Sequence, residues 1–252
     1  WSSDVCSSDL MLMAEKIYTI PVNEAFDQGG ECPFCNMYHR LEQESLDYML
    51  GAAYMADDVR METNKKGFCQ RHYSLMFKQK NRLGLALMLH THMQTVGREL
   101  NVLMSKREKG KKTLFSKKAK DINPISAYID SVTQTCYICD RITHTFERYV
   151  DTFFYMWAKM PEIRDKVKAS KGFCLKHFAM LVQMGESKLS QAEYDNLMDI
   201  ILPLEQENFK RIVDEVEHFT DKFDYRFKDE PWGNSKDSVE RGILKTSSEF
   251  ME

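Results

Sequence analysis

Six cysteines and two histidines recur along the chain in two matching patterns. The first copy reads Cys32-Pro-Phe-Cys35 and later Gly67-Phe68-Cys69-Gln-Arg-His72, and the second reads Cys136-Tyr-Ile-Cys139 and later Gly172-Phe173-Cys174-Leu-Lys-His177. Thiolate and imidazole are soft ligands, and two of them separated by two residues can reach the same ion. The patterns therefore predict metal chemistry.

Each copy contains three cysteines and one histidine, which is a suitable set for tetrahedral Zn²⁺. The spacing from Cys35 to Cys69 is 34 residues, and that from Cys139 to Cys174 is 35. We predict one structural site within each copy, tying the start of one helix to the start of another. The predicted metal ligands are Cys32, Cys35, Cys69 and His72 in the first copy, and Cys136, Cys139, Cys174 and His177 in the second.

Other readings of the same residues stay open. An iron–sulfur cluster with one histidine ligand is the main rival to zinc. Covalent haem is not supported, because Asn36 and Asp140 follow the two CxxC pairs where histidine would be needed. A zinc–thiolate redox switch would use the same cysteines, although the βαβ context of thioredoxin-like chemistry is missing. The simplest alternative is that the cysteines are small buried side chains that recur by chance.

No set of residues indicates an enzyme. Glu215 and His218 match one helical motif of di-iron carboxylate bundles, but such bundles need a second copy of that motif and two further glutamates. His90 and His92 lie two residues apart and would face different sides of a helix. We name no catalytic residues and no cofactor other than the metal, and we favour a non-enzymatic role.

The elements that must position the ligands are helices. Apolar residues at spacings of three and four follow each CxxC, as on the buried face of a long helix. A short stretch led by Pro21 or Pro124 precedes each CxxC, and a further helical pattern follows each GFCxxH. Ser190 and Glu193 form a capping box, whereas Pro203 should kink or split the last long helix. We predict an all-α, internally duplicated protein with about five helices per repeat.

The repeats suggest the domain organisation. Residues 13–104 form the first repeat and 121–223 the second, and the basic linker 105–120 between them has eight Lys/Arg and one Glu. Residues 224–252 form a C-terminal tail without clear helical periodicity, in which Trp232 is expected to anchor the chain to the helical body. Residues 1–12 are interpreted as a non-native leader, because WSSDVCSSDL looks like translated sequencing-adapter sequence. A native disordered tail is the alternative.

Composition limits the classes of function. The net charge is −3, and the sequence contains no apolar run long enough to cross a membrane and no secretory pattern. We therefore expect a cytoplasmic protein, in which cysteines stay reduced and bind metal. The basic linker alone is weak evidence for nucleic-acid binding, because no recognition helix accompanies it.

The duplicated motifs, together with a KDEPWG-type element, resemble an uncharacterised bacterial family of the Firmicutes type. The resemblance covers nearly all of residues 13–245 and implies a cytosolic bacterial protein. Besides the eight Cys and His residues, it rests on Gly67, Gly172 and the segment from Lys228 to Gly233. The family implies no activity.

The sequence thus supports two functional hypotheses. The first is a non-catalytic binding or adaptor module for an unknown macromolecular partner. The second is a thiol-based redox or metal sensor, in which oxidation releases the ion and loosens the helices. Oligomeric state is not predicted.

Overall fold

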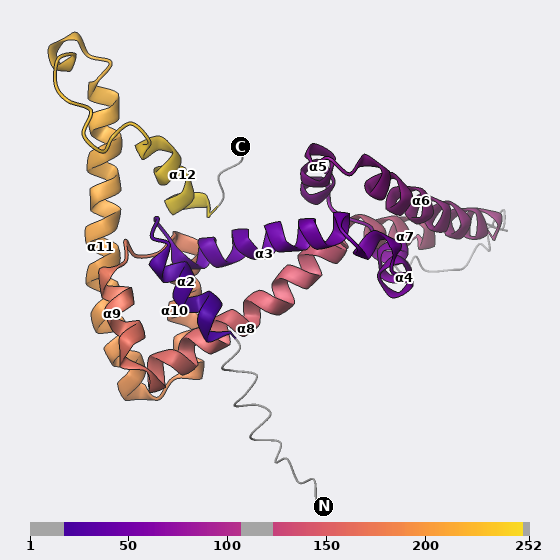
Figure 1. Cartoon of the computed structure of the whole chain (residues 1–252), viewed down its shortest axis with the longest axis horizontal. Coiled ribbons are helices and arrows are strands. Elements are labelled where there is room, and N and C mark those ends of the chain that lie inside the picture. The colour runs from indigo at the N-terminus through magenta and orange to yellow at the C-terminus, as the bar shows by residue number, and fades with distance from the viewer. Residues whose placement is uncertain (1–17, 107–122, 249–252) are drawn as a thin grey trace, which may run out of the picture. The chain divides into compact units, whose positions relative to one another are not determined.

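The fold is described from a computed structural model, which describes residues 18–106 and 123–248. The leader 1–12 and most of the linker 105–120 lie outside these ranges. Within them the chain forms eleven α-helices and two short 3₁₀ helices, and no strand (Figure 1). The predicted all-α class is confirmed.

The helices follow one another in two similar series. The first series is α2 (Thr19–Asp27), α3 (Pro33–Leu50), α4 (Asp57–Lys66), α5 (Gln70–Lys78) and α6 (Arg82–Ser105), with the 3₁₀ helix η1 (Ala53–Met55) after α3. The second is α7 (Pro124–Thr133), α8 (Tyr137–Lys159), α9 (Pro161–Ala169), α10 (Leu175–Lys188) and α11 (Gln191–Asp221). Each series has the order short, long, short, short, long, as expected for about five helices per repeat.

Two further elements follow the second series. These are the 3₁₀ helix η2 (Tyr225–Phe227) and the helix α12 (Ser238–Ser247). The sequence pattern predicted no helix after residue 223. The ten residues of α12 include only three large apolar side chains, Val239, Ile243 and Leu244, and Gly242 lowers the helix propensity of the segment.

The compact units of the molecule do not coincide with the sequence repeats. Among the described residues, unit 1 comprises 18–40 together with 146–248, and unit 2 comprises 41–106 together with 123–145. The division falls inside α3 and α8, the two long helices whose first turns contain the second cysteine of each CxxC pair. As a result α3 begins in unit 1 and ends in unit 2, whereas α8 begins in unit 2 and ends in unit 1.

Unit 1 is built around aromatic side chains. Phe26 of α2 stacks on Phe153 of α8 at 5.9 Å between ring centroids, and Phe34 of α3 packs edge-on against Phe153 at 5.2 Å. Trp157 of α8 is fully buried, and its indole N–H donates to the carbonyl of Glu193 at the start of α11. These contacts join α2, α3 and α8 to α11. In unit 1, α12 packs on α10 and α11.

Unit 2 has a smaller core between α4 and α6. Val59 of α4 and Met88 of α6 are buried there. The Arg60 guanidinium of α4 donates to the Leu87 carbonyl and the Thr91 hydroxyl of α6 at 3.1 and 2.9 Å. The start of α8 also belongs to this unit, where the Arg141 guanidinium lies over the ring of Tyr48 in α3.

Local sequence signals explain several helix boundaries. Ser190 and Glu193 form the predicted capping box of α11, and the Asn81 side chain caps α6 by accepting from the Gly84 N–H at 2.8 Å. Pro203 was expected to kink or split this helix, and it does not split it: α11 continues through Pro203 as one helix. Pro203 is exposed, so water can satisfy the carbonyl that the ring leaves without a partner. No helix in the described ranges combines the length and apolarity that a membrane span requires.

Candidate metal centres

The eight predicted ligands gather into two groups, but not in the predicted pairs. Centre 1 contains Cys32, Cys35, Cys174 and His177, and centre 2 contains Cys69, His72, Cys136 and Cys139. Each CxxC is therefore completed by the CxxH of the other copy. The prediction that each site forms within one copy is wrong.

The path of the long helices explains the exchange. Cys35 lies in the first turn of α3, whose 18 residues carry the chain about 27 Å at 1.5 Å per residue and into unit 2. The CxxH of the same copy, Cys69 and His72, follows in unit 2. In the same way α8 starts with Cys136 and Cys139 in unit 2 and leads into unit 1, where Cys174 and His177 lie. Each centre lies wholly within one unit.

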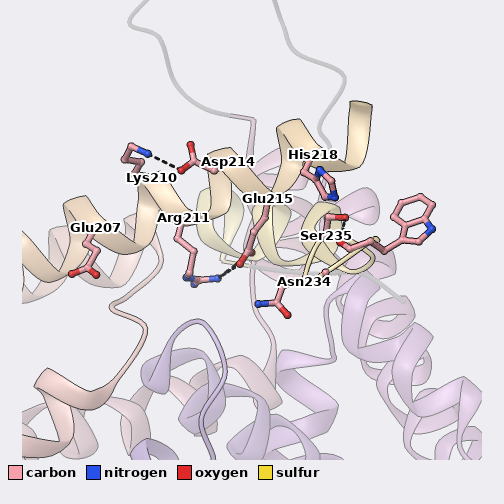
Figure 2. A pocket seen from close by; sticks show the side chains of 10 residues that line it. Glu207, Lys210, Arg211, Asp214, Glu215, His218, Asn234 and Ser235 are labelled. Atoms are coloured by element: carbon pink, nitrogen blue, oxygen red, sulfur yellow. Dashed lines mark hydrogen bonds and ion pairs between the residues drawn. The ribbon is translucent and has the colours of Figure 1, made fainter. Parts of the chain in front are cut away.

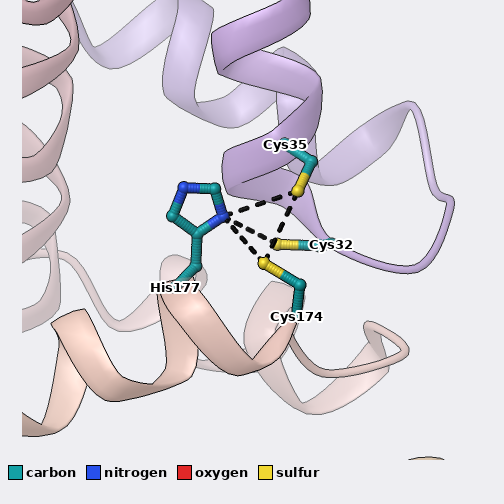
Figure 3. Close-up of side chains that lie close together, drawn as sticks. All are labelled: Cys32, Cys35, Cys174 and His177. Carbon is teal, nitrogen blue, oxygen red and sulfur yellow. Dashed lines mark hydrogen bonds between the residues drawn. The ribbon is translucent and has the colours of Figure 1, made fainter. Parts of the chain in front are cut away.

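Centre 1 is compact and buried (Figure 3). The Nδ1 atom of His177 lies 3.4, 3.5 and 3.1 Å from the sulfur atoms of Cys32, Cys35 and Cys174. The sulfur atoms of Cys35 and Cys174 are 3.6 Å apart. The rings of Phe34 and Phe146 lie beside the imidazole, with ring centroids 5.7 and 5.5 Å away.

Centre 2 has the same arrangement. The Nδ1 atom of His72 lies 3.3, 3.2 and 3.4 Å from the sulfur atoms of Cys69, Cys136 and Cys139. The sulfur atoms of Cys69 and Cys139 are 3.8 Å apart. Cys136 and His72 are buried, whereas Cys69 and Cys139 are only partly buried.

These separations fit a tetrahedral zinc ion. With Zn–S distances of about 2.3 Å and Zn–N distances of about 2.0–2.1 Å, neighbouring ligand atoms lie roughly 3.4–3.8 Å apart. The sulfur–sulfur and sulfur–nitrogen distances in both centres are close to this range. Each group offers four protein ligands, so a bound ion would have a complete shell.

Helix starts position the ligands. Cys69 and Cys174 are the N-cap residues of α5 and α10, and the histidine follows in the first turn. The second cysteine of each CxxC, Cys35 or Cys139, lies in the first turn of α3 or α8. Unpaired backbone N–H groups at these helix starts favour negatively charged sulfur.

The glycine before each FCxxH makes a turn that a side chain would obstruct. Gly67 and Gly172 have φ values of 61° and 74°, in the region that favours glycine. A Cβ atom on Gly67 would lie 2.5 Å from Nε2 of His92, and one on Gly172 would lie 2.6 Å from Oε2 of Glu205. Both glycines therefore adopt a backbone conformation that other residues rarely adopt.

A buried pair of charged residues fixes the turn before Cys174. Lys245 of α12 is fully buried and donates to the carbonyls of Lys171 and Phe173 at 2.7 and 3.0 Å. Glu205 of α11 accepts from the Phe173 N–H at 2.8 Å, and its second oxygen lies 3.7 Å from the Lys245 ammonium. Burial lowers the pKa of Lys245 and raises that of Glu205.

The residue after α12 reaches centre 1 itself. The hydroxyl of Ser248 lies 3.1 Å from the sulfur of Cys174, and its carbonyl lies 3.8 Å from the sulfur of Cys35. Ser248 has a left-handed backbone with φ 66°. The end of α12 therefore covers centre 1.

Two other contacts position centre 2. The backbone N–H of Tyr137 donates to the Gly67 carbonyl at 3.1 Å, which ties the start of α8 to the turn before Cys69. On the far side of the His72 ring, Nε2 lies 3.2 Å from a carboxylate oxygen of Glu42. The Arg71 guanidinium holds the same carboxylate at 2.8 and 2.9 Å. A carboxylate behind a histidine ligand orients the ring and increases its basicity.

The metal-free centres carry shifted pKa values. In centre 2, burial opposes ionisation, but the hydrogen bond with His72 lowers the pKa of Cys136 to about 6. Burial likewise opposes the charge on His72, but Cys136 and Glu42 raise its pKa to about 10. In centre 1, hydrogen bonds from Cys32 and Cys35 lower the pKa of Cys174, and burial raises that of Cys32 to about 12. Each centre therefore has one sulfur that ionises far more readily than a neighbour.

The weaker candidates from the sequence form no third ligand group within the described residues. Glu215 pairs with Arg211 and Arg241, and His218 lies 2.9 Å from the Pro231 carbonyl. Glu215 and His218 both line an open pocket of about 520 Å³. Figure 2 shows their side chains with others that line it. His92 packs against Gly67 instead of joining a ligand group with His90.

Trp232 packs on Phe219 of α11 at 5.7 Å between ring centroids, as expected for an anchor of the tail. Four residues that support the centres could not be identified from the sequence: Glu42, Glu205, Lys245 and Ser248. Each is a common polar residue with no motif of its own. Only the three-dimensional fold brings them to the ligands.

Comparison with other proteins gives a family but no described function. No curated protein matches this chain, and no solved structure matches it. A model of a family of unknown function, DUF6062, matches residues 13–252. The chain belongs to this family.

Proposed function

We propose that this protein is a cytoplasmic zinc-binding helical module in which two structural ions hold the helices in place for binding to a macromolecular partner. The observation that carries the proposal is the gathering of eight Cys and His side chains into two four-ligand groups. Three soft thiolates and one imidazole favour zinc over Mg²⁺ or Ca²⁺, which take oxygen ligands. An iron–sulfur cluster is the alternative occupant.

A structural role follows from the closed ligand sets. Catalytic zinc sites keep one position for water or substrate, whereas structural sites have four protein ligands. Each ion would join the start of α3 to that of α10, or the start of α8 to that of α5. A role in binding is supported by large apolar side chains exposed on α10 and α11, namely Leu175, Leu202 and Val213.

Element-specific metal analysis of the purified chain tests the proposal. We expect about two zinc ions per chain. The single variants Cys69→Ser and Cys174→Ser should each bind about one ion, because the first lacks a ligand of centre 2 and the second lacks a ligand of centre 1. The variant Cys6→Ser changes the seventh cysteine of the sequence, which lies outside both motifs, so it is the control and should retain both ions. A brown protein that contains iron would contradict the assignment of zinc, and a chain that binds no metal would contradict the proposal.

A further inference from the structure

The two centres differ in their exposure to solvent. In centre 1 the exposed fractions of Cys32, Cys35, Cys174 and His177 are 0, 2, 0 and 4%. In centre 2, Cys136 and His72 are equally buried, but Cys69 and Cys139 are only partly buried. Cys69 and Cys139 of centre 2 therefore present part of their surface to solvent, whereas the four ligands of centre 1 are almost fully buried.

The difference has a structural cause. Centre 1 is closed by α12, whose buried Lys245 holds the turn before Cys174 and whose following residue, Ser248, contacts the sulfur atoms of Cys35 and Cys174. Around centre 2, the supporting side chains Glu42 and Arg71 lie on the imidazole side. Among the described residues of unit 2, no side chain outside the ligand group forms a hydrogen bond with the sulfur of Cys69 or Cys139.

We propose that centre 2 is an oxidant-sensitive metal site, in which peroxide converts Cys69 and Cys139 to a disulfide and releases the ion, while centre 1 keeps its ion. The inference rests on the proposed metal-binding function and specifies its regulation. The two partly buried sulfur atoms are 3.8 Å apart, and a disulfide bond requires about 2.0 Å, so a small movement joins them.

The reaction balances with one peroxide. The first thiolate attacks an oxygen of hydrogen peroxide, the O–O bond breaks, and a sulfenic acid forms as hydroxide leaves. The second thiolate attacks that sulfur, the S–S bond forms, and a second hydroxide leaves. Two protons from solvent turn both hydroxides into water, and the two sulfur atoms have lost two electrons to oxygen.

Disulfide formation removes two of the four ligands. Cys136 and His72 remain, and two ligands do not make a closed tetrahedral site. The ion then leaves, and a covalent bond replaces it between the start of α5 and the start of α8. A thiol reductant restores both thiolates and allows the ion to bind again.

Centre 1 is the internal control for this chemistry. Its sulfur atoms of Cys35 and Cys174 are 3.6 Å apart, which is as favourable as the separation in centre 2. Both are buried, so peroxide has no access to them. Because the ligand types are the same in both centres, a comparison of their reactivity tests the effect of burial once the variant below separates burial from the other differences.

The experiment starts from the full chain, for which the number of bound zinc ions is measured before any oxidant is added. Hydrogen peroxide is then added with a chromogenic zinc chelator, and disulfides are mapped by peptide mass spectrometry. We expect about one zinc ion per chain to be released, a Cys69–Cys139 disulfide, and rebinding after reduction. Release of both ions at the same rate, or a disulfide within centre 1, would overturn the inference.

A variant tests the protective role of α12. Lys245→Met removes both hydrogen bonds to the turn before Cys174 and should raise the peroxide-released zinc from about one ion towards two. Lys210→Met is the matched control, because Lys210 is exposed on α11 and pairs with Asp214. An unchanged release from Lys245→Met, with helicity intact, would show that α12 does not protect centre 1.

The two proposals fail in different ways. If the first measurement finds no metal, the proposed function fails. If about two zinc ions are found and peroxide releases neither, or releases both at the same rate, the proposed function stands and the inference fails.

Discussion

At the scale of single residues, His72 shows how one side chain serves two chemical states. Its Nδ1 atom faces three sulfur atoms, and its Nε2 atom faces Glu42. Without metal, an imidazolium can stabilise the thiolate of Cys136. With metal, the neutral imidazole is a ligand and the carboxylate fixes its orientation. Metal binding therefore releases protons.

This pairing predicts a thiolate in metal-free protein at unusually low pH. The pKa of Cys136 is lowered from 9.0 to about 6, so its stabilising contribution is complete above pH 9 and is lost as the pH falls through 6. The pKa of His72 is raised from 6.5 to about 10, so its contribution is complete below pH 6.5 and is lost as the pH rises through 10. Ultraviolet absorbance of the metal-free chain should show a thiolate forming near pH 6.

The Cys136→Ser variant should lose this titration step, and Cys32→Ser should retain it, because the pKa of Cys32 is raised to about 12. A step near pH 6 that survives in Cys136→Ser would contradict the assignment.

At the scale of elements, the turns before α5 and α10 depend on glycine. Gly172 combines a φ of 74° with a neighbouring Glu205 oxygen that leaves no room for a Cβ atom. That oxygen accepts from the Phe173 N–H, so it cannot move away without losing a hydrogen bond. Hydrogen bonds from α11 and α12 therefore hold the turn that precedes Cys174.

Gly172→Ala should lower the free energy of unfolding by about 1–3 kcal/mol, because it adds a strained backbone and a steric clash. Gly97→Ala is the control: Gly97 lies within α6 and has no atom near the added methyl group, so the change should be neutral or stabilise by about 0.4–1 kcal/mol. Urea denaturation of the zinc-saturated proteins measures both. Equal stability of the two variants would contradict the role of this turn.

The sequence was informative for elements that carry their own signals. Apolar spacing predicted α3 and α8, and Ser190 with Glu193 predicted the start of α11. Helix α12 was missed because its main anchor is Lys245, a charged residue that only the surrounding carbonyls and Glu205 make acceptable in the interior. Hydrophobic periodicity assigns a lysine to the exposed face of a helix, so it gives no sign that Lys245 is buried.

At the scale of the whole molecule, the pairing of the half-sites could not be predicted. Both CxxC pairs and both CxxH pairs have the same ligands and nearly the same spacing, so the sequence allows either combination. The choice depends on where α3 and α8 lead the chain, which is set by packing in each unit. For the same reason, the pairing of cysteines in disulfide bonds cannot be deduced from a sequence alone.

Double variants test the crossed pairing directly. Cys32→Ser with Cys174→Ser removes two ligands from centre 1, so about one zinc ion should remain. Cys32→Ser with Cys69→Ser removes one ligand from each centre, so neither centre should keep a full zinc ion per chain. Both variants lose two thiols, and metal analysis distinguishes them. Pairing within each copy would give the opposite result.

The crossed pairing also has a consequence for assembly. A polypeptide with only the first repeat, residues 13–104, would contain two ligands of centre 1 and two ligands of centre 2. It would lack the other two ligands of each centre, which the second repeat provides. Two such polypeptides could complete both by exchanging their CxxH halves, as the subunits of an obligate dimer would. The full chain is therefore organised like a dimer whose two subunits are joined in sequence, and each ion is a contact between them.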